Sequence, residues 1–301
     1  MGASHENRTH DEQGLGVRAL TREIEVASRL ARQAGMIILQ VYATDFVVAL
    51  KGHADPVTEA DKRSNELIVE GLRQAFPDDG IVAEESHDRS AALRTGRVWY
   101  VDPLDGTQEF IAKNGEFSVL IGLAVDGRAS AGVVYRPVVD LLFVGISAQG
   151  AWVEERGSRR PLSVSSQTDP QLLRLVVSRS HRHRLVAAMR DRIGIREEIR
   201  CGSVGVKIGL LAGGDADLYL EPSSVTSAWD ACGPEAVLQG AGGRMTDLVG
   251  APLVYGGHDL RNRRGLVATN GVCHDQVVAA IRPLTREAIH TESRIANEDP
   301  A

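Results

Sequence analysis

The sequence contains few cysteines and no long apolar run, and both absences exclude broad classes of protein. Its 301 residues include three cysteines, which are scattered without CxxC or Cys/His ligand spacing. A disulfide-rich scaffold and a cysteine-based zinc site are therefore excluded, and we expect reduced thiols in a cytoplasmic protein. No apolar run is long enough to span a bilayer, so no stable membrane insertion is expected.

The chain also lacks an excess of positive charge. It has 34 Lys and Arg against 40 Asp and Glu, which gives a net charge of −6. A nucleic acid polymer is therefore not an expected partner, because clustered basic side chains bind its phosphate backbone. A small phosphorylated metabolite remains compatible with this charge, since it needs only local positive charge or a bound metal.

The N-terminal residues lack the features of a targeting segment. MGASHENRTHDEQG has no apolar stretch of the kind found in signal peptides, and Glu6 stands where a myristoylation signal needs Ser or Thr. We expect flexible tails over residues 1–15 and 287–301. The hydrophobic content of 43% and the charged content of 25% are typical of a globular protein.

Periodicity predicts helices and short strands in the first half of the chain. Apolar residues at helical spacing predict a helix over 16–43, and Thr58 with Asp61 is close to a capping box that begins a second helix. Asp61 alone is explained as the capping acid of that helix. The expected strands, the last three antiparallel, cover 46–51, 80–86, 97–102, 117–125, 130–135 and 141–146.

After Gly157, strand-like and helix-like segments alternate, which is typical of an α/β unit. The expected strands cover 172–180, 215–222 and 244–248, and the expected helices cover 185–194, 203–214 and 229–243. We therefore expect an α/β protein of two units. The first is an N-terminal α+β metal-binding unit over 16–155, and the second is a C-terminal α/β substrate unit over 156–286.

Acidic residues gather at the ends of predicted elements. Glu84 and Glu85 follow GIVA, Asp102 and Asp105 follow VWYV, and Asp230 lies at the start of a later helix. Taken singly, the two glutamates fit a solvated loop and Asp230 fits a helix cap. A common function for these acidic residues needs to be considered only if several of their side chains lie close together in the fold.

The pair Asp102 and Asp105 is the most informative. Pro103 fixes the backbone between them, and Gly106 and Thr107 continue a tight turn that can direct two carboxylates and a carbonyl at one point. Hard cations such as Mg²⁺ bind oxygen ligands of this kind. The amides of Gly106 and Thr107 can then hold an anionic oxygen. This combination indicates metal-assisted phosphoryl transfer.

The same turn excludes a competing chemistry. Hydrolases of the haloacid dehalogenase type use D-x-D-G-T, with the first Asp as the nucleophile. Here Pro103 stands two residues before Asp105, and Asp102 stands three before it, so the nucleophile would be missing. No phosphoenzyme is expected.

Together these motifs resemble the inositol monophosphatase superfamily of metal-dependent, lithium-sensitive phosphatases. DPLDGTQEF, with GIVAEES upstream and AWDACGPEAVLQGAGG downstream, matches that superfamily in order and spacing from about Thr21 to Arg282. The resemblance implies a five-layer αβαβα sandwich. It also implies a Mg²⁺-dependent phosphomonoesterase that holds two or three metal ions per site.

The resemblance assigns roles to individual residues. The first metals would bind Glu84, Asp102, Asp105 and the backbone carbonyl of Leu104, while Asp230 would complete the shell of the second metal. Glu85 would hold a third, weaker metal through water. Asp61 and Thr107 match the pair that orients and activates the water for in-line attack on phosphorus.

Within the superfamily, five stretches resemble the CysQ-type 3'(2'),5'-bisphosphate nucleotidases. They are DPVTEAD, DGTQEFIAKNGEFSV, GVVYRPV, SRSH at 178–181 and CGSVGVKIGLLA. The resemblance implies removal of the 3'-phosphate from 3'-phosphoadenosine 5'-phosphate, whose second anion needs charge-assisted hydrogen bonds. The expected substrate-binding residues are Gly106, Thr107, Ser178, Arg179, Ser180, His181, Lys207 and Glu221.

Several alternatives stay open at this point. The basic run 179–184 also fits a solvated helix turn, and Lys207 also fits a surface lysine. Glu221 stands where the bacterial nucleotidases carry a basic residue, so inositol 1-phosphate and sugar bisphosphates are alternative substrates. A non-catalytic relative that binds a phosphorylated metabolite is a further alternative. The sequence does not decide between a monomer and a homodimer.

Overall fold

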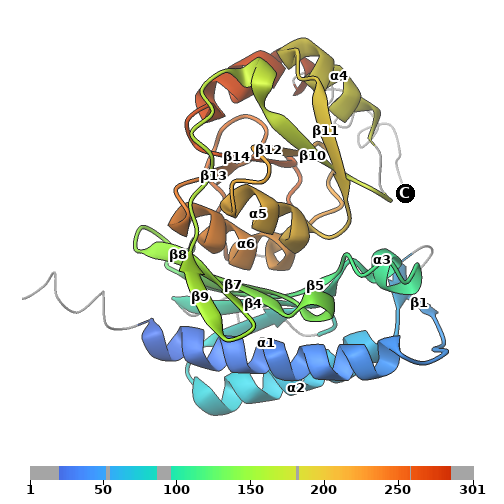
Figure 1. The fold of residues 1–301 in the computed structure, drawn as a ribbon. Coiled ribbons are helices and arrows are strands. Elements are labelled where there is room, and N and C mark those ends of the chain that lie inside the picture. The colour runs from blue at the N-terminus through green and yellow to red at the C-terminus, as the bar shows by residue number, and fades with distance from the viewer. Residues whose placement is uncertain (1–19, 52–54, 87–95, 181–182, 258, 286–301) are drawn as a thin grey trace, which may run out of the picture.

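The computed structural model describes residues 20–51, 55–86, 96–180, 183–257 and 259–285, and the expected tails lie outside these ranges. Figure 1 shows five stacked layers, with a helix pair below a first sheet, a second helix pair between two sheets, and further helices above the second sheet. The predicted αβαβα sandwich is confirmed. Every helix within these ranges is too short or too polar to cross a membrane.

The lowest layer consists of α1 (Thr21–Tyr42) and α2 (Glu59–Ala75). The apolar stripe of α1 packs with α2 against the first sheet, around the fully buried Trp99 and Ile121. The predicted capping box of α2 is present, because the Thr58 amide donates to Asp61 Oδ2 at 2.7 Å and the Ala60 amide donates to the Thr58 hydroxyl. The cap therefore fixes Asp61 at the start of the helix.

The first sheet has seven strands in the order β3 to β9, antiparallel except for the parallel pair β3–β4. The strand expected over 46–51 is wrong in its first half, since β1 begins at Ala49 and pairs only with β2 in a separate ribbon. The strands are β1 (Ala49–Lys51), β2 (Asp55–Val57), β3 (Gly80–Ala83), β4 (Arg97–Asp105), β5 (Ser118–Val125), β6 (Arg128–Arg136), β7 (Leu141–Ile146), β8 (Gly150–Glu155) and β9 (Ser158–Pro161).

The second sheet has five strands in the order β11-β10-β12-β14-β13, of which β11, β10 and β12 are parallel. Its strands are β10 (Arg174–Ser178), β11 (Glu197–Cys201), β12 (Leu218–Glu221), β13 (Arg244–Thr246) and β14 (Leu266–Thr269). The remaining helices are α3 (Thr107–Ile111), α4 (Arg184–Ile193), α5 (Val204–Ala212), α6 (Ala228–Gly240), the 3₁₀ turns Pro137–Val139 and Pro170–Leu172, and a helix over 274–285.

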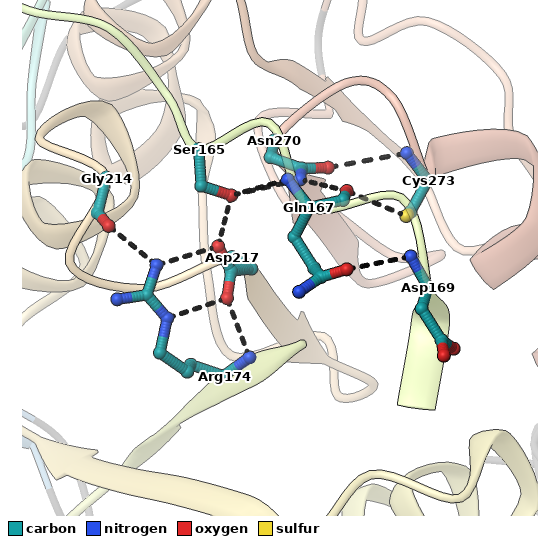
Figure 2. A network of polar contacts seen from close by, with 8 residues as sticks. All are labelled: Ser165, Gln167, Asp169, Arg174, Gly214, Asp217, Asn270 and Cys273. Carbon is teal, nitrogen blue, oxygen red and sulfur yellow. Dashed lines mark hydrogen bonds and ion pairs between the residues drawn. The ribbon is translucent and has the colours of Figure 1, made fainter. Parts of the chain in front are cut away.

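The first sheet extends past residue 155, since β9 pairs with β8. The expected division of the chain into two units near residue 155 stays a prediction. The connection between the sheets is fixed by a polar network (Figure 2). Arg174 Nε donates to Asp217 Oδ2 at 2.8 Å, and Asn270 Nδ2 donates to the Gln167 carbonyl at 2.9 Å. The hydroxyl of Ser165 joins the two halves through Asp217 and Asn270.

Glycines bring α6 unusually close to the first sheet. Gly122, Gly132 and Gly145 are cross-strand neighbours on β5, β6 and β7. A Cβ on Gly132 would lie 2.3 Å from the Gly233 carbonyl oxygen, and one on Gly145 would lie 2.3 Å from Val237 Cα. Only glycine allows this approach, which places the first turn of α6 beside the end of β4.

Candidate active site

Three carboxylates meet where β4 ends and α6 begins. Ligand oxygens of Asp102, Asp105 and Asp230 all lie within 4.8 Å of one another. Residues three apart on a regular strand face opposite sides of the sheet. The pairing of β4 with β5 shifts register between Asp102 and Asp105, and this irregularity lets both carboxylates reach the same cluster.

The electrostatics of this cluster call for a cation. Burial raises the pKa of both Asp102 and Asp230 well above its ordinary value, and the neighbouring carboxylates of Glu84 and Asp105 raise it further. Asp102 is only 2% exposed, so its negative charge is costly without a positive partner. The donors are all oxygen, which fits a hard divalent cation such as Mg²⁺.

Of the other expected metal ligands, Glu84 and Leu104 line the same cavity as the three aspartates. Glu84 is half-buried, hydrogen-bonds through its amide to the Val101 carbonyl at 3.0 Å, and lines the same cavity as the three aspartates. Leu104 also lines this cavity, and its carbonyl oxygen lies 3.2 Å from Thr107 Oγ1. Glu85 is half-buried as well, but it is not among the described residues that line the cavity.

Asp105 is held by the N-terminus of α5. The amides of Val204 and Gly205 donate to its carboxylate at 3.0 and 2.7 Å, and the hydroxyls of Ser118 and Ser203 donate to Oδ2. The helix therefore fixes the orientation of one metal-ligand candidate. Ser203 was not expected at the site, although a serine directly before a helix is a recognisable N-cap signal.

The predicted pair Asp61 and Thr107 meets in the structure. Thr107 Oγ1 lies 3.2 Å from Asp61 Oδ1 and equally far from the Leu104 carbonyl oxygen, and Thr107 lines the cavity. Asp61 is 1% exposed and accepts hydrogen bonds from the amide and hydroxyl of Thr58. Gly106 precedes this turn with φ of +95°, a conformation that favours glycine.

A cavity of about 670 Å³ extends from the carboxylates toward the second sheet. Of the expected substrate residues, Ser178, Lys207 and Glu221 line it, together with Gly106 and Thr107. Lys207 is buried, which removes the surface-lysine alternative. Its Nζ lies 5.1 Å from the Tyr219 ring centroid, and it makes no hydrogen bond or ion pair with any described residue.

Glu221 is 7% exposed and accepts hydrogen bonds from the amide and hydroxyl of Ser223, at 3.1 and 2.6 Å. Other expected residues lie off the cavity. Arg179 is exposed and pairs with Glu116, with 2.6 Å between Nη2 and Oε1. Ser180 does not line the cavity itself, but its hydroxyl donates to Glu109, which does. His181 lies outside the described residues.

Comparisons with known proteins agree with this geometry. The model of the inositol monophosphatase family matches residues 19–286. Over 235 residues the chain is 37% identical to the 3'(2'),5'-bisphosphate nucleotidase CysQ of Salmonella typhimurium, covering 77% of this chain and 93% of that protein. It is 33% identical to inositol monophosphatase 3 of Solanum lycopersicum, covering 86% of this chain and 96% of that protein.

A solved structure, that of CysQ from Bacteroides thetaiotaomicron, matches with a TM-score of 0.71 and 29% identity, covering 83% of this chain and 98% of that chain. These matches confirm the predicted family and the predicted class of enzyme, a metal-dependent phosphatase. With a family model spanning both sheets and relatives above 30% identity, this chain belongs to the inositol monophosphatase family.

Proposed function

We propose that this protein is a Mg²⁺-dependent phosphomonoesterase that removes the 3'-phosphate of 3'-phosphoadenosine 5'-phosphate. The observation that carries the proposal is a single cavity that joins the carboxylate cluster to the buried ammonium of Lys207, which has no ionic partner among the described residues. The CysQ relatives support the choice of a bisphosphate nucleotide as substrate. The Asp61–Thr107 pair favours catalysis over binding alone, because the Thr107 hydroxyl lines the cavity, where it can orient a water.

The residues suited to hold Mg²⁺ are Glu84, Asp102, Asp105, Asp230 and the carbonyl of Leu104, with Glu85 available for a third ion. When bound, two or three such ions would neutralise phosphate charge and lower the pKa of water. The Thr107 hydroxyl donates to Asp61, so its lone pairs can accept a hydrogen bond from the attacking water and orient it. The amides of Gly106 and Thr107 can hold a phosphate oxygen.

Lys207 favours a substrate with two anionic groups. A buried ammonium without an ionic partner is costly, and an anion that binds in the cavity would offset that cost. Inositol 1-phosphate has only the reacting phosphate, which the carboxylate end of the cavity would take. A second phosphate on a nucleotide can reach Lys207 and form a charge-assisted hydrogen bond.

An inositol-phosphate phosphatase is the second candidate function. Glu221 is a buried carboxylate in the cavity, and a carboxylate accepts hydrogen bonds from the hydroxyl groups of a polyol. The relative from Solanum lycopersicum carries the name inositol monophosphatase 3.

We infer a cytoplasmic location for either function, supported by the three free, buried cysteines, and a monomer or homodimer as the active form.

The test is phosphate release from a substrate panel in Mg²⁺, with and without Li⁺. The panel holds 3'-phosphoadenosine 5'-phosphate, inositol 1-phosphate and fructose 1,6-bisphosphate. The proposal predicts the highest kcat/KM for the nucleotide. A higher kcat/KM for inositol 1-phosphate would reject the nucleotide assignment and support the second candidate.

Asp102→Asn is the best variant for separating catalysis from folding. An Asp105→Asn change would place an amide NH₂ against one of the two α5 amides that donate to the two carboxylate oxygens, and would destabilise the fold as well as the site. Asp102 accepts a hydrogen bond from the Leu104 amide at 3.0 Å, which an asparagine oxygen can still accept. Asp275→Asn, at a side chain 87% exposed, is the matched control.

A further inference from the structure

Arg261, in a loop that was not expected at the site, lines the cavity. It lies between β13 and β14, and with Lys207 it is one of two basic residues among the described residues of the cavity lining. Lys207 comes from α5, in the helix layer between the sheets. Positive charge therefore reaches the cavity from two separate elements.

The backbone around Arg261 is fixed against the start of α6. The Ala228 amide donates to the Leu260 carbonyl at 2.7 Å, and the Asn262 amide donates to the Thr226 carbonyl at 2.9 Å. These two hydrogen bonds lie on either side of Arg261, which itself forms an isolated β-bridge with Ser227. The loop is thus attached to the helix that carries part of the carboxylate cluster.

The guanidinium of Arg261 makes no hydrogen bond or ion pair with any described residue, whereas its basic neighbours do. Arg263 pairs with Asp259, and Arg264 Nη1 lies 3.6 Å from Asp247 Oδ2. Neither neighbour lines the cavity. Of these three arginines, Arg261 lines the cavity and forms no ion pair with a described residue, although its charge also acts on the carboxylate of Asp259.

We propose that Arg261 binds the second, non-reacting phosphate of the substrate and so selects bisphosphates over monophosphates. A guanidinium can donate two parallel hydrogen bonds to a phosphate, which makes it a specific partner for this group. The proposal rests on the proposed phosphatase function and refines it. It also explains how positive charge reaches the cavity although Glu221 occupies the position where a basic residue was expected.

The test compares two substrates that share the reacting 3'-phosphate, namely 3'-phosphoadenosine 5'-phosphate and adenosine 3'-phosphate. For Arg261→Gln, kcat/KM on the bisphosphate should fall by about 10- to 100-fold, mainly through KM, because a hydrogen bond between charged groups is lost. The value on adenosine 3'-phosphate should stay within about twofold, since the reacting end is untouched. Arg261→Lys should restore part of the loss, and Arg263→Gln should change neither value.

An equal loss on both substrates, or no loss on the bisphosphate, would overturn the proposal. The choice of nucleotide is tested separately by the substrate panel. Should inositol 1-phosphate prove the better substrate, the same variants are compared on inositol 1-phosphate and inositol 1,4-bisphosphate. A loss confined to the bisphosphate would then support the role of Arg261 even though the nucleotide assignment had failed.

Discussion

Glu235 is a carboxyl group buried in α6, on the same helix as Asp230. Its side chain accepts hydrogen bonds from the Tyr255 hydroxyl at 2.5 Å and from Gln239 Nε2 at 2.8 Å. Burial raises its pKa from 4.5 to about 7, although the hydrogen bond from Tyr255 and the charge of Arg128 act in the opposite direction. Its ionised form is therefore unfavourable in the folded protein.

This pKa predicts a pH-dependent stability. Because the folded pKa lies above the unfolded one, the neutral group stabilises the fold below pH 4.5, and this contribution is lost as the pH rises toward 7. Glu235→Gln, which stays neutral, should exceed the wild type in free energy of unfolding by roughly 2–3 kcal/mol at pH 8 and by much less at pH 5. Urea denaturation at both pH values measures the difference.

The control for this prediction is Glu155→Gln, which changes an exposed glutamate. It should leave the free energy of unfolding within about 0.5 kcal/mol of the wild type at both pH values. A constant difference between Glu235→Gln and the wild type from pH 5 to pH 8 would contradict the raised pKa.

The hydroxyl of Thr107 carries the second prediction at this scale. Thr107→Val removes the hydroxyl that we propose links Asp61 to the attacking water, so kcat should fall by about 10²- to 10³-fold with little change in KM. Thr107→Ser keeps the hydroxyl and should retain most of the activity. Steady-state kinetics on both variants decide the matter, and a valine variant with wild-type kcat would rule out the proposed role.

Among the elements, the N-terminus of α5 connects the carboxylate cluster with the substrate side of the cavity. Its N-cap, Ser203, accepts a hydrogen bond from the Val206 amide at 3.1 Å and donates to Asp105. The φ angle of Ser203 is +55°, which is unfavourable for any residue with a Cβ. The strained backbone of Ser203 therefore places its hydroxyl where it can cap α5 and donate to Asp105.

Two substitutions separate the hydroxyl from the strain. Ser203→Ala loses the cap and keeps the strain, so the free energy of unfolding should fall by about 1–3 kcal/mol. Ser203→Gly also loses the cap but relieves the strain, and should be less destabilised by about 1 kcal/mol. Urea denaturation of both variants gives the comparison. Equal stability of the two, or a more stable alanine variant, would refute this account of α5.

Elements with strong periodicity could be predicted from the sequence, and those fixed by their neighbours could not. The helices α1 and α2 were expected from their apolar stripes and the Thr58 cap. The strand β9 reads SRRP and is exposed, and β11 reads EEIRC, so both are strands because neighbouring strands pair with them. The glycines that contact α6 have no periodic pattern in the sequence. Their role in the close packing of α6 on the first sheet becomes clear only from the structure.

The site divides in the same way. Asp102, Asp105 and Thr107 belong to one turn, and local chemistry was enough to group them. Ser203 has a recognisable N-cap signal, but its contact with Asp105 joins segments far apart in the sequence. Arg261 is positioned by a β-bridge to Ser227, so no short stretch of sequence indicates that either residue lies at the cavity. Arg179 lies in a basic run that suggested an anion site, but its guanidinium forms an ion pair with Glu116 instead.

Across the whole molecule, the carboxylate cluster lies between the first sheet and α6, so a bound ion should stabilise the entire fold. Mg²⁺ at about 100 times its Kd should add about 2.7 kcal/mol to the free energy of unfolding and raise Tm by roughly 5 °C. Asp102→Asn should respond less to Mg²⁺, yet have a higher Tm than the wild type in EDTA, because it removes one of several crowded negative charges.

Thermal denaturation in EDTA and in Mg²⁺ checks this prediction for both proteins, with Asp275→Asn as the control that should follow the wild type. Equal Mg²⁺ responses in Asp102→Asn and the wild type would show that the ion binds elsewhere.

The most direct test of the account is the rate of phosphate release from 3'-phosphoadenosine 5'-phosphate as Mg²⁺ is returned to metal-stripped protein. We predict no release without Mg²⁺, a saturable recovery in the wild type, and a loss of at least about 10³-fold in Asp102→Asn at saturating Mg²⁺. Full activity in the metal-free protein, or a wild-type rate in Asp102→Asn, would contradict the assignment of the carboxylate cluster as the catalytic metal site.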